Sequence, residues 1–430
     1  RIRIDVQVPM RDGVSMSSDI YMPQGDGPFP ALMLRTIYDK QAERYIEWTE
    51  RFVQAGYACV MQDCRGCFRS QGEMDFFWQE GPDGYDTVEW LAAQPWCNGK
   101  IGTTGTSYAG WTQNSLAVLD PPHLTCMWVN EGASNGYTST LRHGGALELR
   151  FLTWLFWHSA INTNTELKRD PGVAEALNGV DTWQILKNLP FKKGETPLAQ
   201  APSYERRALD ILTHGDYDDL WTDPSVNFEL NWELFADVPT VFSSAWYDSY
   251  TRANLENYVG LSQRKKGPYR LVMGPWTHGD VSMGYTYSGG VDLGAEAAFD
   301  YNEERLRWFD RWLKGVSNGV DEGPPLRIFV MGANEWRDEN EWPLARTEYT
   351  PFYFHGNGSA NSITGDGGLS PQPPGNEPPD RFAYDPEYPA PTLGGCTCCN
   401  SEFVSWGAYD QRPVEYRNDV LVFTSEPLKE

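Results

Sequence analysis

Over roughly the first 130 residues, strand-like and helix-like segments alternate along the chain. Strand-like segments bounded by turn residues occur at 30–35, 57–61, 101–106 and 124–129. Apolar residues at helical spacing occur between these segments at 45–56, 83–93 and 108–119, and Asp83 is expected to cap the second helix. This alternation predicts a parallel β-sheet with helices on both of its faces.

The alternation stops near residue 131 and returns further along the chain. Residues 132–236 instead contain aromatic-rich helical stretches, at 151–157 and 181–189. Strand-like runs then reappear at 238–242 and 269–273, followed by helical patterns at 251–261 and 302–313. We therefore predict an α/β domain made of residues 1–131 and 237–345, interrupted by a helical insert of residues 132–236. The insert is expected over the carboxyl end of the sheet, where such folds keep their sites.

The segment 346–430 has a different pattern of residues. Short β-like pieces at 349–354, 401–406 and 420–424 are separated by Gly, Pro, Asn and Asp. Three or four strands do not close a β-sandwich. We therefore predict a partial β domain, and we expect a second chain or fragment to complete it.

Composition narrows the class of partner. The 430 residues are 40% hydrophobic and 22% charged, which is typical of a globular protein. The net charge of −24 argues against nucleic-acid binding, which needs clustered Lys and Arg. The sequence has no apolar run long enough to span a bilayer and no visible signal peptide, so no membrane partner is expected. The expected location is cytoplasmic, but a periplasmic or secreted location stays open because the native N-terminus is not visible. An oligomeric state also stays open.

The sharpest chemical signal is Gly105-Thr-Ser107-Tyr-Ala-Gly110, between a predicted strand and a predicted helix. A nucleophile elbow places a Ser on a sharp turn and needs small residues around it. Ala109 stands where the usual Gly-x-Ser-x-Gly pattern has its second Gly, but Ala is also small. A Ser in such a turn can be a plain structural residue; the strand–turn–helix context favours Ser107 as a nucleophile.

A Ser nucleophile needs a base and an acid that holds the base in place. In α/β-hydrolases these partners follow in the order Ser, acid, His, each just past a strand end. His278 fits, because it follows a predicted strand at a turn, and Asp248 fits as the acid at the end of the strand that begins at residue 238. Asp280 is the alternative acid, but it comes in the wrong order. Of the other histidines, His143, His158 and His214 fall in the insert and are interpreted as surface or packing residues, and His355 lies in the C-terminal β region; like His123, none of them follows a predicted strand downstream of Ser107 at a turn.

Several motifs together resemble one family, that of the cocaine esterase, α-amino acid ester hydrolase and X-Pro dipeptidyl-peptidase serine hydrolases. The motifs are Arg35-Thr-Ile-Tyr-Asp-Lys40, Asp63-Cys-Arg-Gly66, Ser70-Gln-Gly72, Asp83-Gly-Tyr-Asp-Thr-Val-Glu-Trp90, Pro95-Trp-Cys-Asn-Gly-Lys-Ile-Gly102, Gly105-Thr-Ser-Tyr108, Trp246-Tyr-Asp248, Gly274-Pro-Trp276 with His278, and Leu306-Arg-Trp-Phe-Asp-Arg-Trp-Leu-Lys-Gly315. The resemblance implies an α/β-hydrolase domain, an inserted helical cap and a C-terminal jelly roll. It also implies the triad Ser107, Asp248 and His278.

The resemblance further implies an oxyanion hole made by the Tyr38 hydroxyl and the backbone N–H of Tyr108. Two donors aimed at the tetrahedral intermediate stabilise its negative charge. Candidate substrate-pocket residues are the aromatic side chains Tyr250, Trp154, Phe156 and Trp157. The last three could equally form the buried core of the insert, whereas Tyr250 corresponds to a pocket aromatic of the family.

Two groups of cysteines are spaced closely enough to suggest metal binding. They are Cys64 with Cys67, and Cys396 with Cys398 and Cys399. No His accompanies either group in the sequence, so we predict loop cysteines and no metal, with redox or disulfide chemistry as the alternative.

The sequence as a whole predicts a serine hydrolase that cleaves a small-molecule carboxylic ester or amide through an acyl-enzyme, with no cofactor. The rate is expected to rise with pH as His278 loses its proton, at about pH 6 to 7. The alternatives are an X-Pro dipeptidyl-peptidase or a β-lactam or amino-acid ester acylase on the same triad, and an inactive binding protein on this fold.

Overall fold

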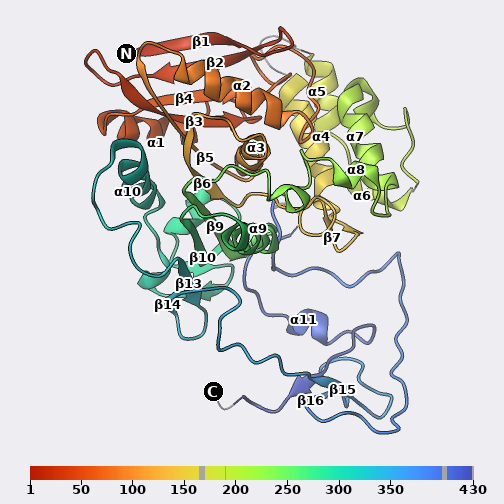
Figure 1. Ribbon diagram of the computed structural model, residues 1–430. Helices are drawn as coiled ribbons and strands as arrows, with labels where there is room; N and C mark the ends of the chain where they lie inside the picture. The colour runs from red at the N-terminus through yellow and green to blue at the C-terminus, as the bar shows by residue number, and fades with distance from the viewer. Residues whose placement is uncertain (164–169, 189, 400–403, 429–430) are drawn as a thin grey trace.

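The computed structural model describes residues 1–163, 170–188, 190–399 and 404–428. A ten-stranded sheet with the order β1-β2-β4-β3-β5-β6-β9-β10-β13-β14 runs through the described part of the chain (Figure 1). Its strands are β1 (Ile2–Pro9), β2 (Ser15–Tyr21), β3 (Phe29–Thr36), β4 (Ala58–Asp63), β5 (Cys97–Thr106), β6 (Leu124–Asn130), β9 (Thr240–Tyr247), β10 (Tyr269–Thr277), β13 (Leu326–Val330) and β14 (Glu335–Glu339). The strands from β4 to β13 are parallel, and β1, β2 and β14 extend the two edges with antiparallel pairing.

Helices cover both faces of this sheet, as the alternation predicts. They are α1 (Glu43–Gln54), α2 (Glu80–Ala92), α3 (Tyr108–Ala117), α9 (Thr251–Arg264) and α10 (Tyr301–Lys314). One apolar cluster includes side chains of α2, α3 and α9, and a second includes side chains of α1 and α10. Because both faces are covered, the central strands are largely apolar; all six residues of β4 are buried, including Gln62 and Asp63 at its carboxyl end.

Two predictions about this domain were incomplete or wrong. Asp83 does not cap α2, because the helix already begins at Glu80; the Asp83 carboxylate is buried and pairs with Arg65 at 2.6 Å. The pattern also gave no clear strands for β1 and β14. Both lie at sheet edges and carry charged residues on their exposed side, so they lack the continuous apolar run of the central strands.

The insert between β6 and β9 is mainly helical. Its elements are β7 (Arg142–His143), β8 (Ala146–Leu147), α4 (Arg150–Thr163), α5 (Pro171–Asn178), α6 (Thr182–Lys187), α7 (Pro202–Thr213) and α8 (Asp219–Thr222). Asp181 caps α6 by accepting hydrogen bonds from the backbone of Trp183 and Gln184. The end of this helix was predicted at Leu189, which lies outside the described residues.

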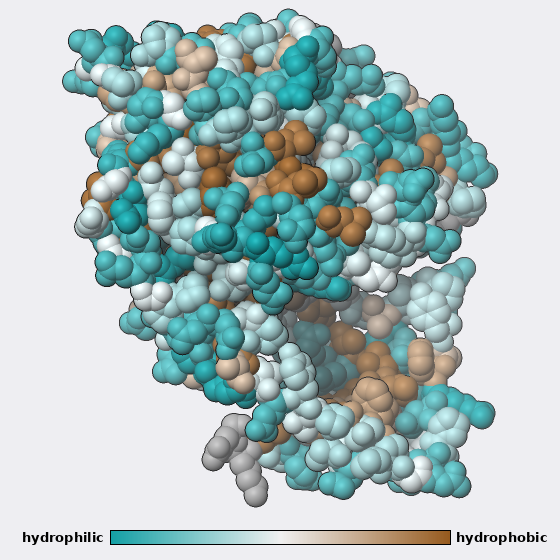
Figure 2. Space-filling view, viewed as in Figure 1, coloured by the Kyte–Doolittle hydropathy of each residue, from teal (hydrophilic) through white to brown (hydrophobic). Residues whose placement is uncertain are grey.

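The C-terminal region, residues 346–430, has little regular structure within its described part. It contains β15 (Tyr353–His355), β16 (Gly368–Ser370), α11 (Arg412–Glu415) and β17 (Thr424–Ser425), and a further hairpin, β11 (Tyr287–Ser288) with β12 (Val291–Asp292), precedes it. The strands predicted at 349–354 and 420–424 are therefore shorter than expected. In the third predicted strand, residues 401–403 lie outside the described residues and 404–406 do not form a strand. Figure 2 shows a hollow with apolar side chains between this region and the rest of the molecule.

No helix within the described ranges has both the length and the apolar character needed to cross a bilayer.

Candidate active site

Ser107 occupies a sharp turn between β5 and α3. Its φ angle is 63°, in the left-handed region that residues with a Cβ seldom adopt. A Cβ at Gly105 would lie 2.5 Å from the Cβ of Ala109, and one at Gly110 would lie 2.7 Å from the backbone oxygen of Asn130. The small residues of the motif are therefore required by the close approach of strand and helix, and the turn exposes Ser107 at the carboxyl edge of the sheet.

The structure brings the three predicted side chains together at this edge. Asp248 directly follows β9 and His278 directly follows β10, so both lie near Ser107 at the end of a parallel strand. His278 Nε2 is 2.9 Å from Ser107 Oγ, and His278 Nδ1 is 2.7 Å from Asp248 Oδ1. The other carboxylate oxygen of Asp248 accepts a hydrogen bond from Ser244 at 3.1 Å. Hydroxyl, imidazole and carboxylate thus form one hydrogen-bonded line, whereas Asp280 lines the neighbouring cavity.

A second carboxylate, Glu131, lies beside His278 and was missed by the sequence analysis. Its Oε2 is 3.1 Å from His278 Nδ1 and accepts a hydrogen bond from the backbone N–H of Gly279 at 2.7 Å. Glu131 is fully buried and is the first residue after β6. Its position just past a parallel strand is the same signal that pointed to Asp248, so the sequence could have marked Glu131 as a candidate, although not its contact with His278.

Burial and the two carboxylates have opposite effects on the pKa of His278. Burial, together with the nearby Asp248, raises the pKa of Glu131 well above its ordinary value. Burial alone would lower the pKa of His278, but Cys398, Glu131 and Asp248 outweigh it, so the pKa of His278 is raised. The imidazolium form of His278 is therefore favoured compared with a free histidine.

Tyr38 lies against the same cavity as Ser107. The indole N–H of Trp154 donates to the Tyr38 hydroxyl oxygen at 3.1 Å, so the phenol proton is left to point elsewhere. Burial raises the pKa of Tyr38 well above 10, which keeps the phenol protonated and able to donate. Tyr108 is the first residue of α3, and N–H groups in the first turn of a helix have no partner within the helix.

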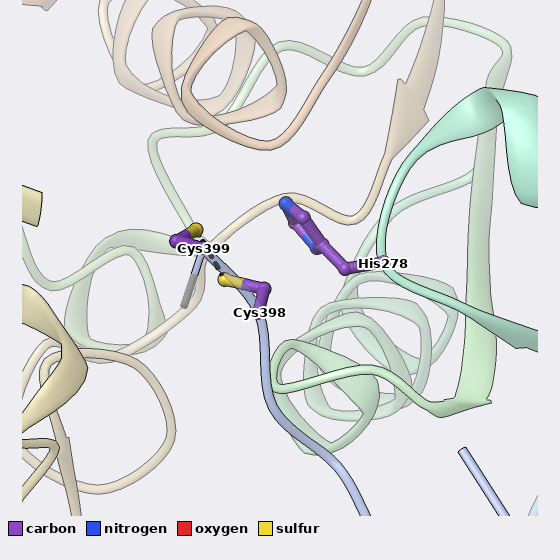
Figure 3. A group of neighbouring side chains, drawn as sticks. All are labelled: His278, Cys398 and Cys399. Carbon is purple, nitrogen blue, oxygen red and sulfur yellow. Dashed lines mark hydrogen bonds between the residues drawn. The ribbon is translucent and has the colours of Figure 1, made fainter. Parts of the chain in front are cut away.

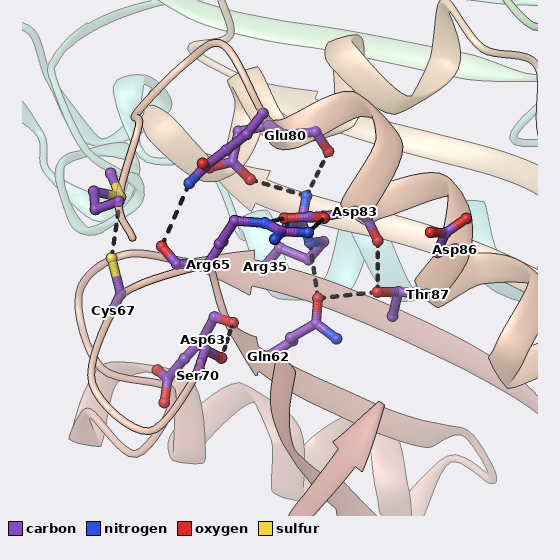
Figure 4. Close-up of polar contacts among 12 residues, drawn as sticks. Arg35, Gln62, Asp63, Arg65, Cys67, Ser70, Glu80, Asp83, Asp86 and Thr87 are labelled. Atoms are coloured by element: carbon purple, nitrogen blue, oxygen red, sulfur yellow. Dashed lines mark hydrogen bonds and ion pairs between the residues drawn. The ribbon is translucent and has the colours of Figure 1, made fainter. Parts of the chain in front are cut away.

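A buried polar network holds the side chain of Tyr108 beneath this turn. The Tyr108 hydroxyl donates to Glu80 Oε1 at 2.9 Å and accepts from the backbone N–H of Phe77 at 2.9 Å. Glu80 in turn pairs with Arg35 at 2.9 Å, and both side chains are completely buried (Figure 4). Because breaking such a buried pair leaves an uncompensated charge, the network fixes where α3 begins.

A cavity of about 610 Å³ adjoins Ser107 and His278. Three of the four predicted pocket residues line it, namely Trp154, Phe156 and Trp157. Trp154 and Phe156 are also buried, and Trp157 is 47% exposed, so this stretch forms both the core of the insert and one wall of the cavity.

The fourth predicted pocket residue, Tyr250, is not part of the cavity wall. It is buried, with its ring centroid 5.6 Å from that of His278 and 5.4 Å from the guanidinium carbon of Arg150. Tyr250 is instead positioned to support the imidazole from behind. Cys399 and Trp406 of the C-terminal region complete the cavity wall, and nothing in their local sequence indicated this.

The two cysteine groups differ in their surroundings. Cys64 and Cys67 are both buried in the hydrophobic core. Cys398 and Cys399 lie beside His278, although the sequence places no His near them (Figure 3).

Comparison with known proteins identifies the family. The family described as X-Pro dipeptidyl-peptidase (S15 family) matches residues 12–280, and the X-Pro dipeptidyl-peptidase C-terminal non-catalytic domain matches residues 318–430. The cocaine esterase of Rhodococcus sp. (strain MB1 Bresler) is 36% identical over 438 residues, which cover 99% of this chain and 74% of the esterase.

Solved structures show the same fold at lower sequence identity. An aminopeptidase from a marine sediment archaeon, Thaumarchaeota archaeon, superposes with a TM-score of 0.76 at 22% identity, covering 100% of this chain and 72% of its own. An α-amino acid ester hydrolase superposes with a TM-score of 0.75 at 22% identity, covering 100% of this chain and 73% of its own. The chain therefore belongs to the X-Pro dipeptidyl-peptidase (S15) family of serine hydrolases, with an α/β-hydrolase-like fold and a C-terminal non-catalytic domain.

Proposed function

We propose that this protein hydrolyses a small-molecule carboxylic ester through an acyl-enzyme on Ser107. The observation that carries the proposal is the hydrogen-bonded line from Ser107 through His278 to Asp248, at 2.9 Å and 2.7 Å. Ser107 Oγ attacks the carbonyl carbon while His278 Nε2 takes its proton, and the protonated imidazole then gives that proton to the leaving alcohol. Water repeats the sequence on the acyl-enzyme and releases the acid. Asp248 holds the imidazole orientation and stabilises its charged form.

The oxyanion of each tetrahedral intermediate is proposed to lie between the Tyr38 hydroxyl and the Tyr108 N–H. The hydrogen bond from Trp154 to the Tyr38 oxygen supports this role, since it leaves the phenol proton for the intermediate. Each such donor contributes on the order of 3 kcal/mol to transition-state stabilisation.

The charges around the cavity favour an ester over a substrate with a free ammonium group. Among the described residues that line the cavity, Asp280 is the single carboxylate, while Arg44 and Arg305 are cationic. An amino-acid ester or an X-Pro dipeptide would need carboxylates to bind its ammonium group. Amino-ester acylase and dipeptidyl-peptidase activity on the same triad are therefore the second candidates, and an inactive binding protein is the third.

The remaining parts of the chain are proposed to serve this site as a cap and a jelly roll. Within the insert, α4 supplies Trp154 and Trp157 to the cavity, and α5 and α6 supply Leu177 and Thr182, as a cap would. In the C-terminal region the aromatic side chains of Tyr349, Phe354 and Tyr384 are 66% to 82% exposed, which supports a further β segment, in a second chain or fragment, packing on them. Native mass spectrometry of the active protein tests this: a single species with the mass of these 430 residues would contradict it.

The proposed function is tested by labelling and by a substrate panel. A fluorophosphonate is expected to label one residue stoichiometrically, and peptide mapping is expected to find the label on Ser107. An aryl ester of a neutral acid is expected to be turned over faster than an amino-acid ester or an X-Pro anilide. Faster cleavage of the anilide would favour the peptidase alternative, and absence of labelling would favour the inactive binding protein.

A further inference from the structure

The adjacent residues Cys398 and Cys399 place two thiols beside His278 (Figure 3). One atom from each side chain, the two Sγ atoms and an imidazole nitrogen, lies within 4.8 Å of the other two. The cysteines come from the C-terminal region and the histidine from the end of β10, so the tertiary structure alone assembles this group. Two thiolates and one imidazole are ligands that Zn²⁺ and other thiophilic divalent cations prefer.

We propose that Cys398, Cys399 and His278 form a binding site for a thiophilic divalent cation, and that occupation of this site switches off the hydrolase by withdrawing His278 from its hydrogen bonds. The second half of the inference rests on the proposed function. A cation of this class binds three protein ligands and leaves a fourth tetrahedral position open for water or a substrate group.

The surroundings of the pair favour metal binding. Arg150 Nη1 donates to Cys398 Sγ at 3.0 Å, and the sulfurs of Cys398 and Cys399 lie 2.6 Å apart. The two sulfurs therefore lie close enough together to bind one cation after a small separation.

The binding step balances without any change in oxidation state. Each thiol that still carries a proton releases it to solvent as its sulfur binds the cation, and no electron is transferred. Tetrahedral metal–sulfur bonds of about 2.3 Å require the two sulfurs to separate to roughly 3.7 Å. Cys399 is exposed and lines the cavity with His278, so the cation can enter from the cavity and the Cys399 side chain has room to turn.

The cation would inactivate the hydrolase by binding either nitrogen of the His278 imidazole. His278 Nε2 is hydrogen-bonded to Ser107, and His278 Nδ1 is hydrogen-bonded to Asp248. Glu131 also faces Nδ1. A cation on Nε2 removes the base from the nucleophile, and a cation on Nδ1 displaces the orienting carboxylate. Either event breaks the line of hydrogen bonds on which the proposed mechanism depends.

The test uses Cd²⁺ alone, added to the full chain that has been reduced with a metal-free phosphine. Titration is expected to give ultraviolet absorption from cadmium–thiolate bonds that saturates at one equivalent, in the absence of any substrate. Cys398→Ser and Cys399→Ser are expected to weaken this binding by more than about tenfold. The matched control is Cys396→Ser: this thiol lies on the same segment and donates to the backbone oxygen of Trp246 at 3.1 Å, outside the group, so its loss should leave cadmium binding unchanged.

Activity is measured on the same samples as a second readout. One equivalent of Cd²⁺ is expected to abolish ester hydrolysis by the unmodified protein, and a chelator is expected to restore it. Unchanged tight binding in Cys398→Ser would overturn the site, and full activity with one equivalent bound would overturn the switch. Because binding is recorded without substrate, failure of the Ser107 mechanism is distinguishable: Ser107→Ala is expected to bind Cd²⁺ whether or not the protein is an esterase.

Discussion

The carboxyl edge of the sheet and the C-terminal region both contribute to one cavity, but they are built in different ways. At the sheet edge, β5, β6, β9 and β10 are consecutive parallel strands that end on the same side, and they are buried between two helical layers. In the C-terminal region the described strands have two or three residues each, and large aromatic side chains such as Tyr388 are more than 70% exposed. Even so, this region supplies Cys399 and Trp406 to the cavity.

The difference shows what is needed to hold a chemical group in place. A side chain at the end of a buried strand inherits the rigidity of the sheet, because moving it requires repacking both layers. A side chain on a segment with few buried contacts is held only by its local partners, as Cys398 is by Arg150. We therefore expect catalytic chemistry at the sheet edge and adjustable chemistry, such as cation binding, in the C-terminal region.

The largest expected effect is at the proposed nucleophile. Ser107→Ala should lower kcat by about 10⁶-fold, because the acyl-enzyme cannot form. Initial rates with an aryl ester measure this loss, with circular dichroism to check the fold. Retention of more than a small fraction of activity would show that the sheet edge does not hold the nucleophile.

Replacing the orienting acid should have a smaller effect. Asp248→Asn is expected to lower kcat by about 10⁴-fold, since the amide favours the wrong imidazole tautomer. Glu131 also faces His278 Nδ1 at 3.1 Å, so Glu131→Gln is the matched variant and should lose far less. If the two variants lose activity in the reverse order, Glu131 rather than Asp248 is the orienting acid.

Core substitutions compare the stability of the two regions directly. Phe242 on β9 is fully buried, and Phe242→Ala should lower the free energy of unfolding by about 3 to 5 kcal/mol. Phe354 on β15 is 66% exposed and contacts Phe423, so Phe354→Ala should cost less than about 1 kcal/mol. Urea unfolding followed by fluorescence measures both, and similar losses would contradict the contrast drawn between the regions.

Removing the proposed oxyanion donor Tyr38 is expected to cost a similar free energy, but in the transition state of the reaction rather than in the stability of the fold. Tyr38→Phe should lower kcat by about 10²- to 10³-fold with little change in KM, because the donor acts mainly in the transition state. Tyr45→Phe, which removes another cavity-lining hydroxyl, is the control and should retain activity. An equal loss in both variants would argue against a specific role for Tyr38.

The smallest effect concerns pH. The raised pKa of His278 means that its base form appears at higher pH than for a free histidine, so kcat/KM should rise through a midpoint above about 6.5. Glu131→Gln removes one group that favours the imidazolium, so the midpoint should fall by about one unit. Asp280→Asn alters a carboxylate that lines the cavity and should shift the midpoint less than Glu131→Gln does. A midpoint at or below the ordinary histidine value of about 6.5 in the unmodified protein would contradict the raised pKa of His278 and agree with the expectation from sequence.

The sequence was most informative where burial is two-sided. The largely apolar runs of β3, β4 and β6, alternating with helical patterns, predicted the parallel sheet, because strands covered on both faces are mostly apolar. The edge strands β1 and β14 and the short strands of the C-terminal region lack that signal, since one face or both meet solvent. The positions of Ser107, Asp248 and His278 just past predicted strands likewise pointed to these three residues from the sequence alone.

The sequence by itself indicated the alternation of strands and helices, the sharp turn at Ser107 and the types of residue that follow β9 and β10, because these depend on local sterics and on the periodicity of apolar positions. Only the tertiary structure decided that Glu131 faces His278, that Tyr250 packs behind the imidazole rather than lining the cavity, and that Cys398 and Cys399 lie beside His278. These contacts join segments more than 100 residues apart in the case of Glu131 and of the cysteines. Pairings at such separations depend on how whole layers pack, and no local pattern encodes them.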